Sequence, residues 1–594
     1  MMVDAKNLIE MSNAVRATAL RALRHAKSGH VGIALGAADI ITMIYAVFLN
    51  PARDRFVLSA GHGSALLYAI LKLAGYRVGD LDSLRRLDGL PGHPEFGIDG
   101  VSATTGPLGQ GVANAVGMAI AEKHFNSDGR IYCMASDGDL MEGVANEAIS
   151  FAGRYKLNNL VLLWDNNGVS IDGVAQTDIN MAARMRAAGW DVRVANGHDF
   201  DEMYDAVSAE SNGPVFVQCN TVIGIGSSAA GGSRAHGFDL SDAEIASLIE
   251  DLDSVRGREL WGMIARTHAT PRPRKYAVAP NPLLPDVPHF ASTREMSGVY
   301  LSRIMSRAKN IICGSADLGH STNVRVDGTV PITSNDFSGN YINYGVREHA
   351  MAAIMNGMAY SGLRAVGSTF LAFSDYMRGA MRLAALAGLP VVYVLTHDSI
   401  AVGPDGPTHQ PVEQLSGLRL VPNMNVFRPA NMLEVAWAWR TALSETSRPS
   451  CIVLSRQKIM RTGAPVWGYV DAGGYIIYKP KSSHIRMTII ATGSEVPLAI
   501  AVAHRLGAWV QVASIPSVAH FRAMDAEYKN HILRGRVVAI EAAATAPWFE
   551  FADDVIGIDD FGLSGPGDMV YRECGFDADE IAAAIRAKMK NVGI

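Results

Sequence analysis

Short runs of β-branched and other apolar residues recur along the chain, and longer stretches with helical spacing of apolar positions separate them. Runs of this length between helices are typical of parallel strands that are covered on both faces of a sheet. The pattern therefore predicts an α/β protein whose sheets are mainly parallel and doubly wound. The predicted strands are residues 131–134, 160–164, 215–217, 391–395, 451–454, 488–491 and 537–540.

Two breaks in this pattern divide the chain, whose 594 residues are too many for one hydrophobic core. Residues 268–290 carry six prolines and little periodicity, so they are predicted to be a linker. A second break falls at residues 462–481. We predict three doubly wound domains, at residues 1–267, 291–462 and 485–594.

The first residues and the most apolar stretches of the sequence give no sign of a membrane or secretory segment. Residues 1–24 have a helical pattern without the continuous apolar region of a signal peptide. The apolar stretches 40–49 and 384–395 are too short or too interrupted to cross a bilayer. The sequence therefore predicts a cytoplasmic protein with no membrane partner.

Composition and charge narrow the class of protein further. Hydrophobic residues make up 48% and charged residues 19%, which predicts well-packed domains rather than disorder. A net charge of −5 gives no electrostatic footprint for nucleic acid. There are five cysteines, without CxxC spacing, and four lie in apolar, strand-like runs. We expect these four to be small core residues in a reducing compartment, namely Cys133, Cys219, Cys313 and Cys451.

Polar clusters follow two of the predicted strands. Asp137 and Gly138 come after the strand at 131–134, and Asn167 and Val169 come after the strand at 160–164. The carboxyl ends of parallel strands are where ligands bind in open α/β sheets. A carboxylate from Asp137, an amide oxygen from Asn167 and the carbonyl of Val169 would suit magnesium and leave room for diphosphate oxygens. Either cluster by itself is more simply a polar turn, but together they predict a metal and diphosphate site.

These clusters resemble the metal motif of thiamine diphosphate enzymes, which is usually Gly-Asp-Gly followed by a double Asn. Ser136 stands where that motif has its first Gly. Further motifs are similar to those of the transketolase family over essentially the whole chain. They lie at residues 28–30, 53–63, 91–95, 106–111, 345–349, 396–410 and 561–566.

The resemblance implies a thiamine diphosphate-binding fold and a function. Its first domain would bind diphosphate and metal, its second the aminopyrimidine, and its third would be the C-terminal transketolase domain. The activity would be transfer of a two-carbon ketol unit from xylulose 5-phosphate to ribose 5-phosphate or erythrose 4-phosphate, in the non-oxidative pentose phosphate pathway. The implied cofactors are thiamine diphosphate with Mg²⁺, or Ca²⁺ or Mn²⁺. The implied assembly is a homodimer with active sites at the subunit interface.

Six histidines lie beside Gly, Ser, Thr or Pro in predicted loops, where site residues concentrate. A lone histidine is more often structural, but imidazole suits proton movements on sugar hydroxyls near neutral pH. The resemblance places four of them at the sugar, namely His30, His93, His397 and His409. It places His62 at the cofactor and His236 between cofactor and sugar.

Glu348 precedes a helical pattern at 350–359, where a carboxylate is favoured by the helix dipole alone. The resemblance implies that it is the essential acid, which donates to the aminopyrimidine ring, with His30, His236 and His409 as further catalytic residues. Phe370, Phe373 and Tyr376 have the spacing of an ordinary core stripe. By resemblance they form the pocket that stacks on the aminopyrimidine. Other implied cofactor contacts are Gly106, Pro107, Leu108, Gly138 and Asp317.

The resemblance also implies a clamp for the substrate phosphate, made by Arg294, Ser321 and Arg456. Guanidinium groups suit a phosphate because they bind it through paired hydrogen bonds, although a solvated arginine is the commoner case. Asp405 matches the carboxylate that binds a sugar hydroxyl.

Some features depart from the family or leave other functions open. Val31 and Ser233 replace a Pro and a His found in many members, and the chain is short. The alternatives are another carboligase, such as deoxyxylulose phosphate synthase or dihydroxyacetone synthase, and a catalytically silent paralogue kept as a binding protein. The motif at 396–410 argues against the first of these enzymes, and the presence of Glu348, Asp137 and Asn167 argues against a silent paralogue. Gly224-Ile225-Gly226 is too short a match to predict a dinucleotide site.

Overall fold

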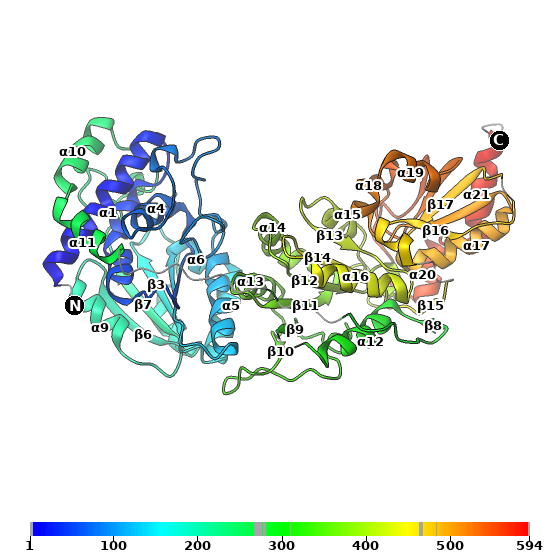
Figure 1. The fold of residues 1–594 in the computed structure, drawn as a ribbon, viewed down its shortest axis with the longest axis horizontal. Helices are drawn as coiled ribbons and strands as arrows, with labels where there is room; N and C mark the ends of the chain where they lie inside the picture. The colour runs from blue at the N-terminus through cyan, green and yellow to red at the C-terminus, as the bar shows by residue number, and fades with distance from the viewer. Residues whose placement is uncertain are drawn as a thin grey trace. The chain divides into compact units, whose positions relative to one another are not determined.

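The computed structural model describes residues 4–265, 276, 281–308, 310–462, 467–482 and 484–591. The chain forms two compact units (Figure 1). The first comprises Met1–Lys275, Thr333–Ser338 and Ala353–Gly362, and the second comprises Tyr276–Ile332, Gly339–Ala352 and Leu363–Ile594.

The first unit is built on a parallel five-stranded sheet of order β1-β2-β3-β7-β6. Its strands are β1 (Arg55–Leu58), β2 (Ile131–Ser136), β3 (Leu160–Asn166), β7 (Val215–Asn220) and β6 (Asp191–Asn196). All of β2 is buried, as its continuous apolar run predicts. β6 was not predicted, because its residues alternate between polar and apolar and it lies at the sheet edge, only partly buried. A short antiparallel pair follows β3, formed by β4 (Val169–Ser170) and β5 (Gly173–Val174).

Helices cover the sheet of the first unit (Figure 1). The longest is α1 (Ala5–Ala26), which buries Leu8, Met11 and Val15 at helical spacing, as residues 1–24 predict. Its N-cap Asp4 accepts a hydrogen bond of 2.7 Å from the Asn7 amide. The other helices are α2 (Val31–Gly36), α3 (Ala38–Met43), α4 (Ser64–Leu73), α5 (Gln110–His124), α6 (Asp137–Met141), α7 (Gly143–Arg154), α8 (Met181–Ala187), α9 (Phe200–Ser208), α10 (Asp242–Leu252) and α11 (Val255–Ala265).

The second unit contains a parallel six-stranded sheet of order β10-β9-β11-β12-β14-β13. Its strands are β10 (Tyr341–Asn343), β9 (Ile311–Ser315), β11 (Arg364–Phe370), β12 (Val392–Thr396), β14 (Ser450–Leu454) and β13 (Asn425–Phe427). An antiparallel pair joins β8 (Phe290–Ala291) to β15 (Ile459–Met460). Its helices are α12 (Thr293–Met305), α13 (Glu348–Tyr360, whose residues from Ala353 belong to the first unit), α14 (Arg378–Leu386), α15 (Gln414–Arg419) and α16 (Met432–Ser444).

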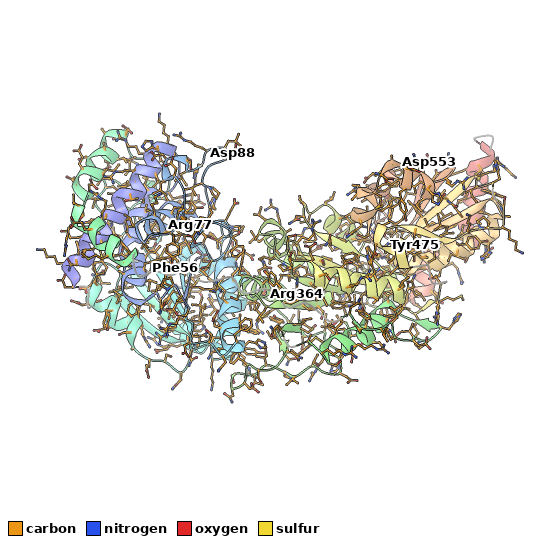
Figure 2. All side chains as sticks on the ribbon, in the orientation of Figure 1. Phe56, Arg77, Asp88, Arg364, Tyr475 and Asp553 are labelled. Atoms are coloured by element: carbon orange, nitrogen blue, oxygen red, sulfur yellow. The ribbon has the colours of Figure 1, made fainter. Side chains whose placement is uncertain are left out.

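The strand β11 was not predicted, because Arg364, Gly367 and Ser368 interrupt its apolar residues. All seven of its residues are nevertheless buried. The Arg364 guanidinium (Figure 2) donates to the carbonyls of Pro390 and Glu445 at 3.2 and 2.5 Å. A buried charge of this kind is tolerated because it is hydrogen-bonded.

A second sheet in this unit has the order β16-β18-β17-β19-β20, and only β16 is antiparallel to its neighbour. Its strands are β16 (Tyr475–Tyr478), β17 (Met487–Ala491), β18 (Val510–Ser514), β19 (Arg536–Ile540) and β20 (Asp554–Ile556). The helices of this part are α17 (Val496–Leu506), α18 (Val518–Ala523), α19 (Ala526–Ile532), α20 (Gly567–Glu573) and α21 (Ala578–Asn591).

The predicted fold class is confirmed, since the three main sheets are mainly parallel and all seven predicted strands are present. The four cysteines of the apolar runs are buried and free. Most of the predicted linker, residues 268–275 and 277–280, lies outside the described residues. Within the described part of the chain, no helix is long and apolar enough to cross a membrane.

Candidate active site

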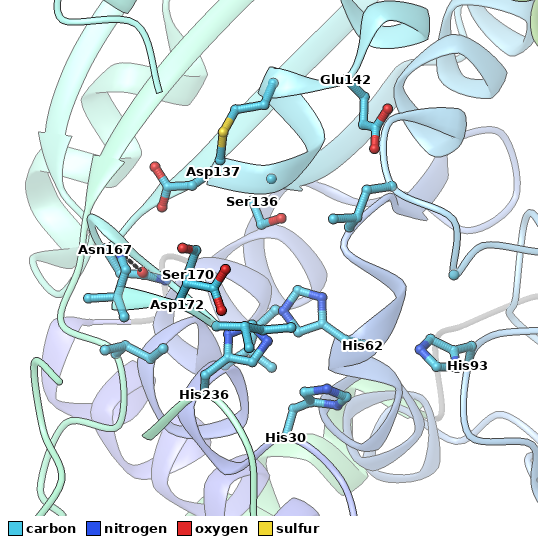
Figure 3. A pocket seen from close by; sticks show the side chains of 18 residues that line it. His30, His62, His93, Ser136, Asp137, Glu142, Asn167, Ser170, Asp172 and His236 are labelled. Atoms are coloured by element: carbon cyan, nitrogen blue, oxygen red, sulfur yellow. Dashed lines mark hydrogen bonds between the residues drawn. The ribbon is translucent and has the colours of Figure 1, made fainter. Parts of the chain in front are cut away.

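One cluster of predicted site residues lies in the first unit, at the carboxyl ends of β1, β2 and β3 (Figure 3). It surrounds a cavity of about 500 Å³. The parallel register places Ser136 of β2 beside Asp165 of β3, so the polar residues after both strands meet at one edge of the sheet. The predicted residues that line the cavity are His30, His62, His93, Gly106, Leu108, Asp137, Gly138, Asn167, Val169 and His236; Pro107 does not line it.

Asp137 is suited to hold a cation. Its side chain is buried, and neither carboxylate oxygen accepts a hydrogen bond of normal geometry from the described residues, although the Gly168 and Asn167 amides and the Trp164 indole lie near enough to lower its pKa. Burial, together with the nearby charge of Asp165, raises the pKa of Asp137 to about 7. A divalent metal would relieve this burial of an unpaired carboxylate. The Asn167 amide oxygen accepts from the Val169 amide at 3.0 Å, which orders the turn that carries the other two expected ligands. The donor set is therefore that of a hard cation such as Mg²⁺.

Ser136, the departure from the usual metal motif, has a structural role. It is the N-cap of α6, where its side chain and that of Asp139 form a capping box. Asp139 also accepts from the Ser59 hydroxyl at 2.5 Å and from the Gly109 amide at 2.8 Å. This one carboxylate therefore connects the end of β1, the loop at 106–111 and the start of α6.

Two glycine-rich loops approach each other closely beside the cavity. A Cβ atom at Gly61 would lie 2.6 Å from the Gly106 nitrogen, a distance that no side chain can adopt. Gly106 has a φ of 148°, which also favours glycine. Contact between the backbones leaves amide groups close to the cavity, as a diphosphate requires.

Four imidazoles gather at the other end of the cavity (Figure 3). The ring centroid of His30 lies 5.1, 5.4 and 6.5 Å from those of His62, His236 and His93. Burial, reinforced by the neighbouring imidazoles, lowers the pKa of His62 to about 3 and that of His30 to about 4. These rings are therefore neutral at physiological pH, so each presents one donor and one acceptor to a ligand.

The structure adds residues to this cluster that were not predicted. Arg85 donates to the Ser28 hydroxyl at 2.8 Å, and its charge lowers the pKa of both His30 and His93, after burial. Its φ of 60°, unusual for a residue with a side chain, is the kind of constraint found at functional sites. Sequence pattern gave no signal for it, because exposed arginines are common. Other lining residues that were not predicted are Ile33, Met141, Glu142, Ser170, Ile171, Asp172 and Ile223.

A second cluster lies in the second unit and is centred on Glu348, the first residue of α13. Its side chain is buried, and it accepts a hydrogen bond of 3.3 Å from the Thr369 hydroxyl. Burial raises the pKa of Glu348, which favours the protonated form that the resemblance requires. The start of the helix favours the charged carboxylate, so burial outweighs it at this position.

The predicted aromatic residues come directly after Thr369, the hydrogen-bond partner of Glu348. Phe370 and Phe373 stack with their centroids 5.9 Å apart, and Tyr376 lies 6.3 Å beyond Phe373. Phe370 also stacks on His397 at 3.7 Å, and Phe373 meets His409 edge to face at 5.1 Å. The structure therefore brings the predicted aromatic pocket and two predicted substrate histidines together.

Two arginines face this second cluster. Burial, and then the charges of Arg294 and Arg456, lower the pKa of His397 to about 3. The Arg294 guanidinium donates to the Ser321 carbonyl at 2.5 Å, while its Nε is buried without a hydrogen-bond partner among the described residues. Two cations beside a neutral histidine, one with an unsatisfied N–H, form a site for an anion.

Two other predicted site residues, Asp317 and Asp405, are exposed on the surface of this chain. Asp317 follows β9, is exposed and has a φ of 62°. Asp405 is exposed in the loop after β12. Tyr376 is 68% exposed, so one side of its ring is uncovered in this chain.

Family models match three parts of the chain. They are "Transketolase, thiamine diphosphate binding domain" over residues 8–255, "Transketolase, pyrimidine binding domain" over residues 290–461 and "Transketolase-like TK C-terminal domain" over residues 473–577. The parallel sheets and these matches define an α/β enzyme of the thiamine diphosphate-dependent class.

Individual relatives are similar over almost the whole chain. A transketolase of Cereibacter sphaeroides is 39% identical over 99% of this chain and 100% of that protein, and one of Geobacillus stearothermophilus is 39% identical over 96% and 98%. The solved structure of transketolase from Leishmania mexicana has a TM-score of 0.93 and 33% identity, covering 98% and 97% of the two chains. A Pichia stipitis transketolase in complex with sedoheptulose 7-phosphate has a TM-score of 0.87 and 33% identity, covering 98% of each chain.

The chain belongs to the transketolase family. It is an enzyme that transfers ketol groups, and its cofactor is thiamine diphosphate. The alignment with the Cereibacter relative spans 656 positions, more than the 594 residues of this chain, so that relative has segments that this chain lacks.

Proposed function

We propose that the enzyme takes phosphorylated sugars, moving a two-carbon ketol unit from xylulose 5-phosphate to ribose 5-phosphate or erythrose 4-phosphate. The observation that carries this proposal is the pair of arginines beside His397, with the buried and unpaired Nε of Arg294. A phosphate oxygen would satisfy that N–H. The structural relative from Pichia stipitis that was solved with sedoheptulose 7-phosphate supports the same substrate class.

We assign the residues of the first cluster to the cofactor and metal. Asp137, Asn167 and the Val169 carbonyl would hold the divalent metal, and Gly106, Pro107, Leu108 and Gly138 would lie against the diphosphate. Bound thiamine diphosphate supplies a carbon nucleophile and an electron sink. His62 would face the cofactor, and His236 would lie between cofactor and sugar. The unpaired oxygens of Asp137 support this assignment.

We assign the second cluster to proton transfer and recognition. Glu348 would hold a proton toward the aminopyrimidine, and Phe370, Phe373 and Tyr376 would stack on that ring, with Asp317 nearby. His30, His93, His397 and His409 would contact the sugar, and Asp405 would bind one of its hydroxyls. Arg294, Ser321 and Arg456 would bind its phosphate. The raised pKa of Glu348, caused by burial, supports its role as an acid.

We further propose that the three domains lie at residues 1–267, 291–462 and 485–594 and that the enzyme works in the cytoplasm as a homodimer. The buried free cysteines are consistent with a reducing compartment. Large apolar residues are exposed near both clusters, which supports a partner surface there. They are Ile171 at 72%, Val174 at 78%, Val346 at 74% and Tyr376 at 68% exposure.

The experiment is a ketol-transfer assay with xylulose 5-phosphate and ribose 5-phosphate, with and without thiamine diphosphate and Mg²⁺, on the parent and on Glu348→Gln. The variant should lose about 10²- to 10⁴-fold in kcat while keeping most of its cofactor affinity in calorimetry. Equal turnover by parent and variant would remove Glu348 from its role. A parent without ketol transfer would favour a catalytically silent paralogue. Turnover with other acceptors only would favour a different carboligase.

A further inference from the structure

A buried cluster of charged side chains connects the C-terminal part of the second unit to the loop that carries His397. Arg428 and Asp398 are each 1% exposed, and Glu495 and Glu541 are 0% exposed. Asp398 follows β12 and Arg428 follows β13, whereas Glu495 precedes α17 and Glu541 follows β19. The cluster therefore contains residues from both of the main sheets of this unit.

The guanidinium of Arg428 is the centre of the cluster. Its Nε and Nη2 lie 3.0 and 2.9 Å from Asp398 Oδ2, and its Nη1 pairs with Glu495. Arg419 binds Glu541 through two hydrogen bonds of 2.7 and 2.8 Å. Burial would raise the pKa of Glu541, but Arg419 and Arg428 outweigh it and hold that pKa at about 2. Buried charges persist only when they are paired in this way, so the geometry of the cluster is tightly defined.

The backbone around Arg428 is equally constrained. The Gly493 amide donates to the Arg428 carbonyl at 3.0 Å. A Cβ atom at Gly493 would lie 2.8 Å from Arg428 Cγ, and the φ of this glycine is 50°. The turn before α17 is therefore held directly against Arg428.

Tyr571 of α20 extends the cluster to the residue after Asp398. Its hydroxyl lies 2.8 Å from Glu495 Oε1 and 2.9 Å from Ser399 Oγ. Further along the same loop, the Gln410 amide donates to the Leu563 carbonyl at 2.9 Å and to the Gly403 carbonyl at 3.0 Å. The C-terminal part of the unit thus holds the loop at both ends, two residues after His397 and directly after His409.

His397 needs such support because its backbone is in an unfavourable conformation. Its φ is 61°, in the left-handed region that glycine prefers, and its ring stacks on Phe370 at a centroid distance of 3.7 Å. A residue with a side chain stays in this region only when its surroundings hold it there. The two residues that follow it, Asp398 and Ser399, are the ones bound by Arg428 and Tyr571.

We propose that the C-terminal domain positions the substrate-facing histidine of this enzyme: Glu495 orients His397 through Arg428 and Asp398, and Tyr571 orients it through Ser399. Tyr571 and Glu495 are positioning residues, since neither is assigned to the substrate. The inference rests on the proposed function, because it assumes that His397 contacts the sugar.

The test compares Tyr571→Phe with a matched control, Tyr475→Phe. Tyr475 of β16 (Figure 2) also bonds a buried glutamate: its hydroxyl lies 2.5 Å from Oε1 of Glu434 in α16. Among the described hydrogen bonds, Glu434 contacts no residue that is assigned to substrate or cofactor. Both variants remove one hydroxyl that bonds a buried glutamate. We expect similar losses of thermal stability from the two.

The readout is kcat/KM for xylulose 5-phosphate in two backgrounds, the parent and His397→Ala. In the parent, Tyr571→Phe should lower kcat/KM by about 3- to 10-fold, as for loss of one hydrogen bond, while Tyr475→Phe changes it little. In the His397→Ala background, Tyr571→Phe should have no further effect, because its influence passes through His397.

Equal effects of Tyr571→Phe in both backgrounds, or no effect in the parent, would overturn the inference and leave the assigned activity intact. A parent enzyme without ketol transfer would instead overturn the proposed function. Should Tyr571→Phe fail to fold, Glu495→Gln with Glu434→Gln as its control poses the same question.

Discussion

At the scale of single residues, the two clusters combine groups whose charge state is set by burial. In the first cluster, His30 and His62 are held neutral. In the second, Glu348 is shifted toward its protonated form and Arg294 keeps an unsatisfied N–H. Such shifts collect at functional sites, because chemistry near neutral pH needs acids and bases that exchange protons there.

The arginine pair gives a prediction about specificity. Replacing Arg294 or Arg456 by Ala should chiefly raise KM for phosphorylated sugars. The lost binding free energy should be about 1.5 to 3 kcal/mol, as expected for a hydrogen bond to a charged group. Hydroxypyruvate has no phosphate, so its kcat/KM should change little. Steady-state kinetics with both donors measures the difference. Equal losses for the two donors would mean that these arginines are structural.

The neutral histidines give a prediction about acid stability. In the folded enzyme the pKa values of His62 and His30 are about 3 and about 4, well below the usual value of 6.5. Between pH 6.5 and 4 the unfolded chain therefore binds more protons than the native one, and stability falls as the pH is lowered, by at most about 1.4 kcal/mol per pH unit for each group.

Thermal unfolding of the cofactor-free enzyme across this pH range should show a shallower dependence in His62→Gln than in the parent. The exposed His484 provides the control, since His484→Gln leaves the buried cluster intact. Parallel curves for His62→Gln and the parent would contradict the prediction.

At the scale of elements, the sheets position the sites, because the carboxyl ends of parallel strands bring distant loops to one edge. The first cluster uses the loops that follow β1, β2 and β3, which are far apart in sequence. In the second unit, His397 follows β12 and Arg456 follows β14, its neighbour in the sheet. Loop sequences can therefore depart from the family motif as long as the strand ends stay in register.

Ser136, the N-cap of α6, is one such departure from the family motif. Its side chain caps the helix and pairs with Asp139. Ser136→Ala should cost about 0.5 to 2 kcal/mol, whereas Ser136→Gly, which restores the usual motif, should cost only a few tenths. Thermal unfolding would resolve this as a fall in Tm of roughly 2 to 4 °C per kcal/mol for a unit of this size. Equal stability of the Ala and Gly variants would show that the cap contributes nothing.

At the scale of the whole molecule, the residues assigned to metal and diphosphate belong to the first unit, and Glu348 belongs to the second. In the proposed homodimer these parts come from opposite subunits. The large exposed apolar side chains near both clusters are consistent with such an arrangement.

Co-expression of Asp137→Ala and Glu348→Ala chains gives a sharp test of this assembly. Each variant by itself should be inactive. If active sites form between subunits, a mixed dimer has one site with both residues intact, so random pairing should restore about a quarter of the parental activity. Separately purified variants that are mixed without subunit exchange serve as the control. A co-expressed pair without activity, or a parent that sediments as an active monomer, would exclude the shared site.

The sequence by itself determined the fold class, which the structure confirms. Buried parallel strands need continuous apolar runs, so β2, β3, β12 and β14 could be predicted, and the family resemblance at 345–349 and 396–410 led to the assignment of Glu348, His397 and His409 to the site. The strands β6 and β11 could not be predicted. β6 is an edge strand, which tolerates polar residues. β11 contains a buried arginine that is satisfied only by carbonyls distant in sequence.

Only the tertiary structure decided which residues influence one another. Arg85 beside His30, the bonds of Asp139 to Ser59 and Gly109, and the cluster around Arg428 depend on contacts between segments far apart in the chain, and no local pattern encodes them. The same holds for protonation, since the pKa of Asp137 or His62 is set by burial and neighbouring charges rather than by residue type. Sequence fixes which chemical groups are present, whereas packing sets their distances and their solvation.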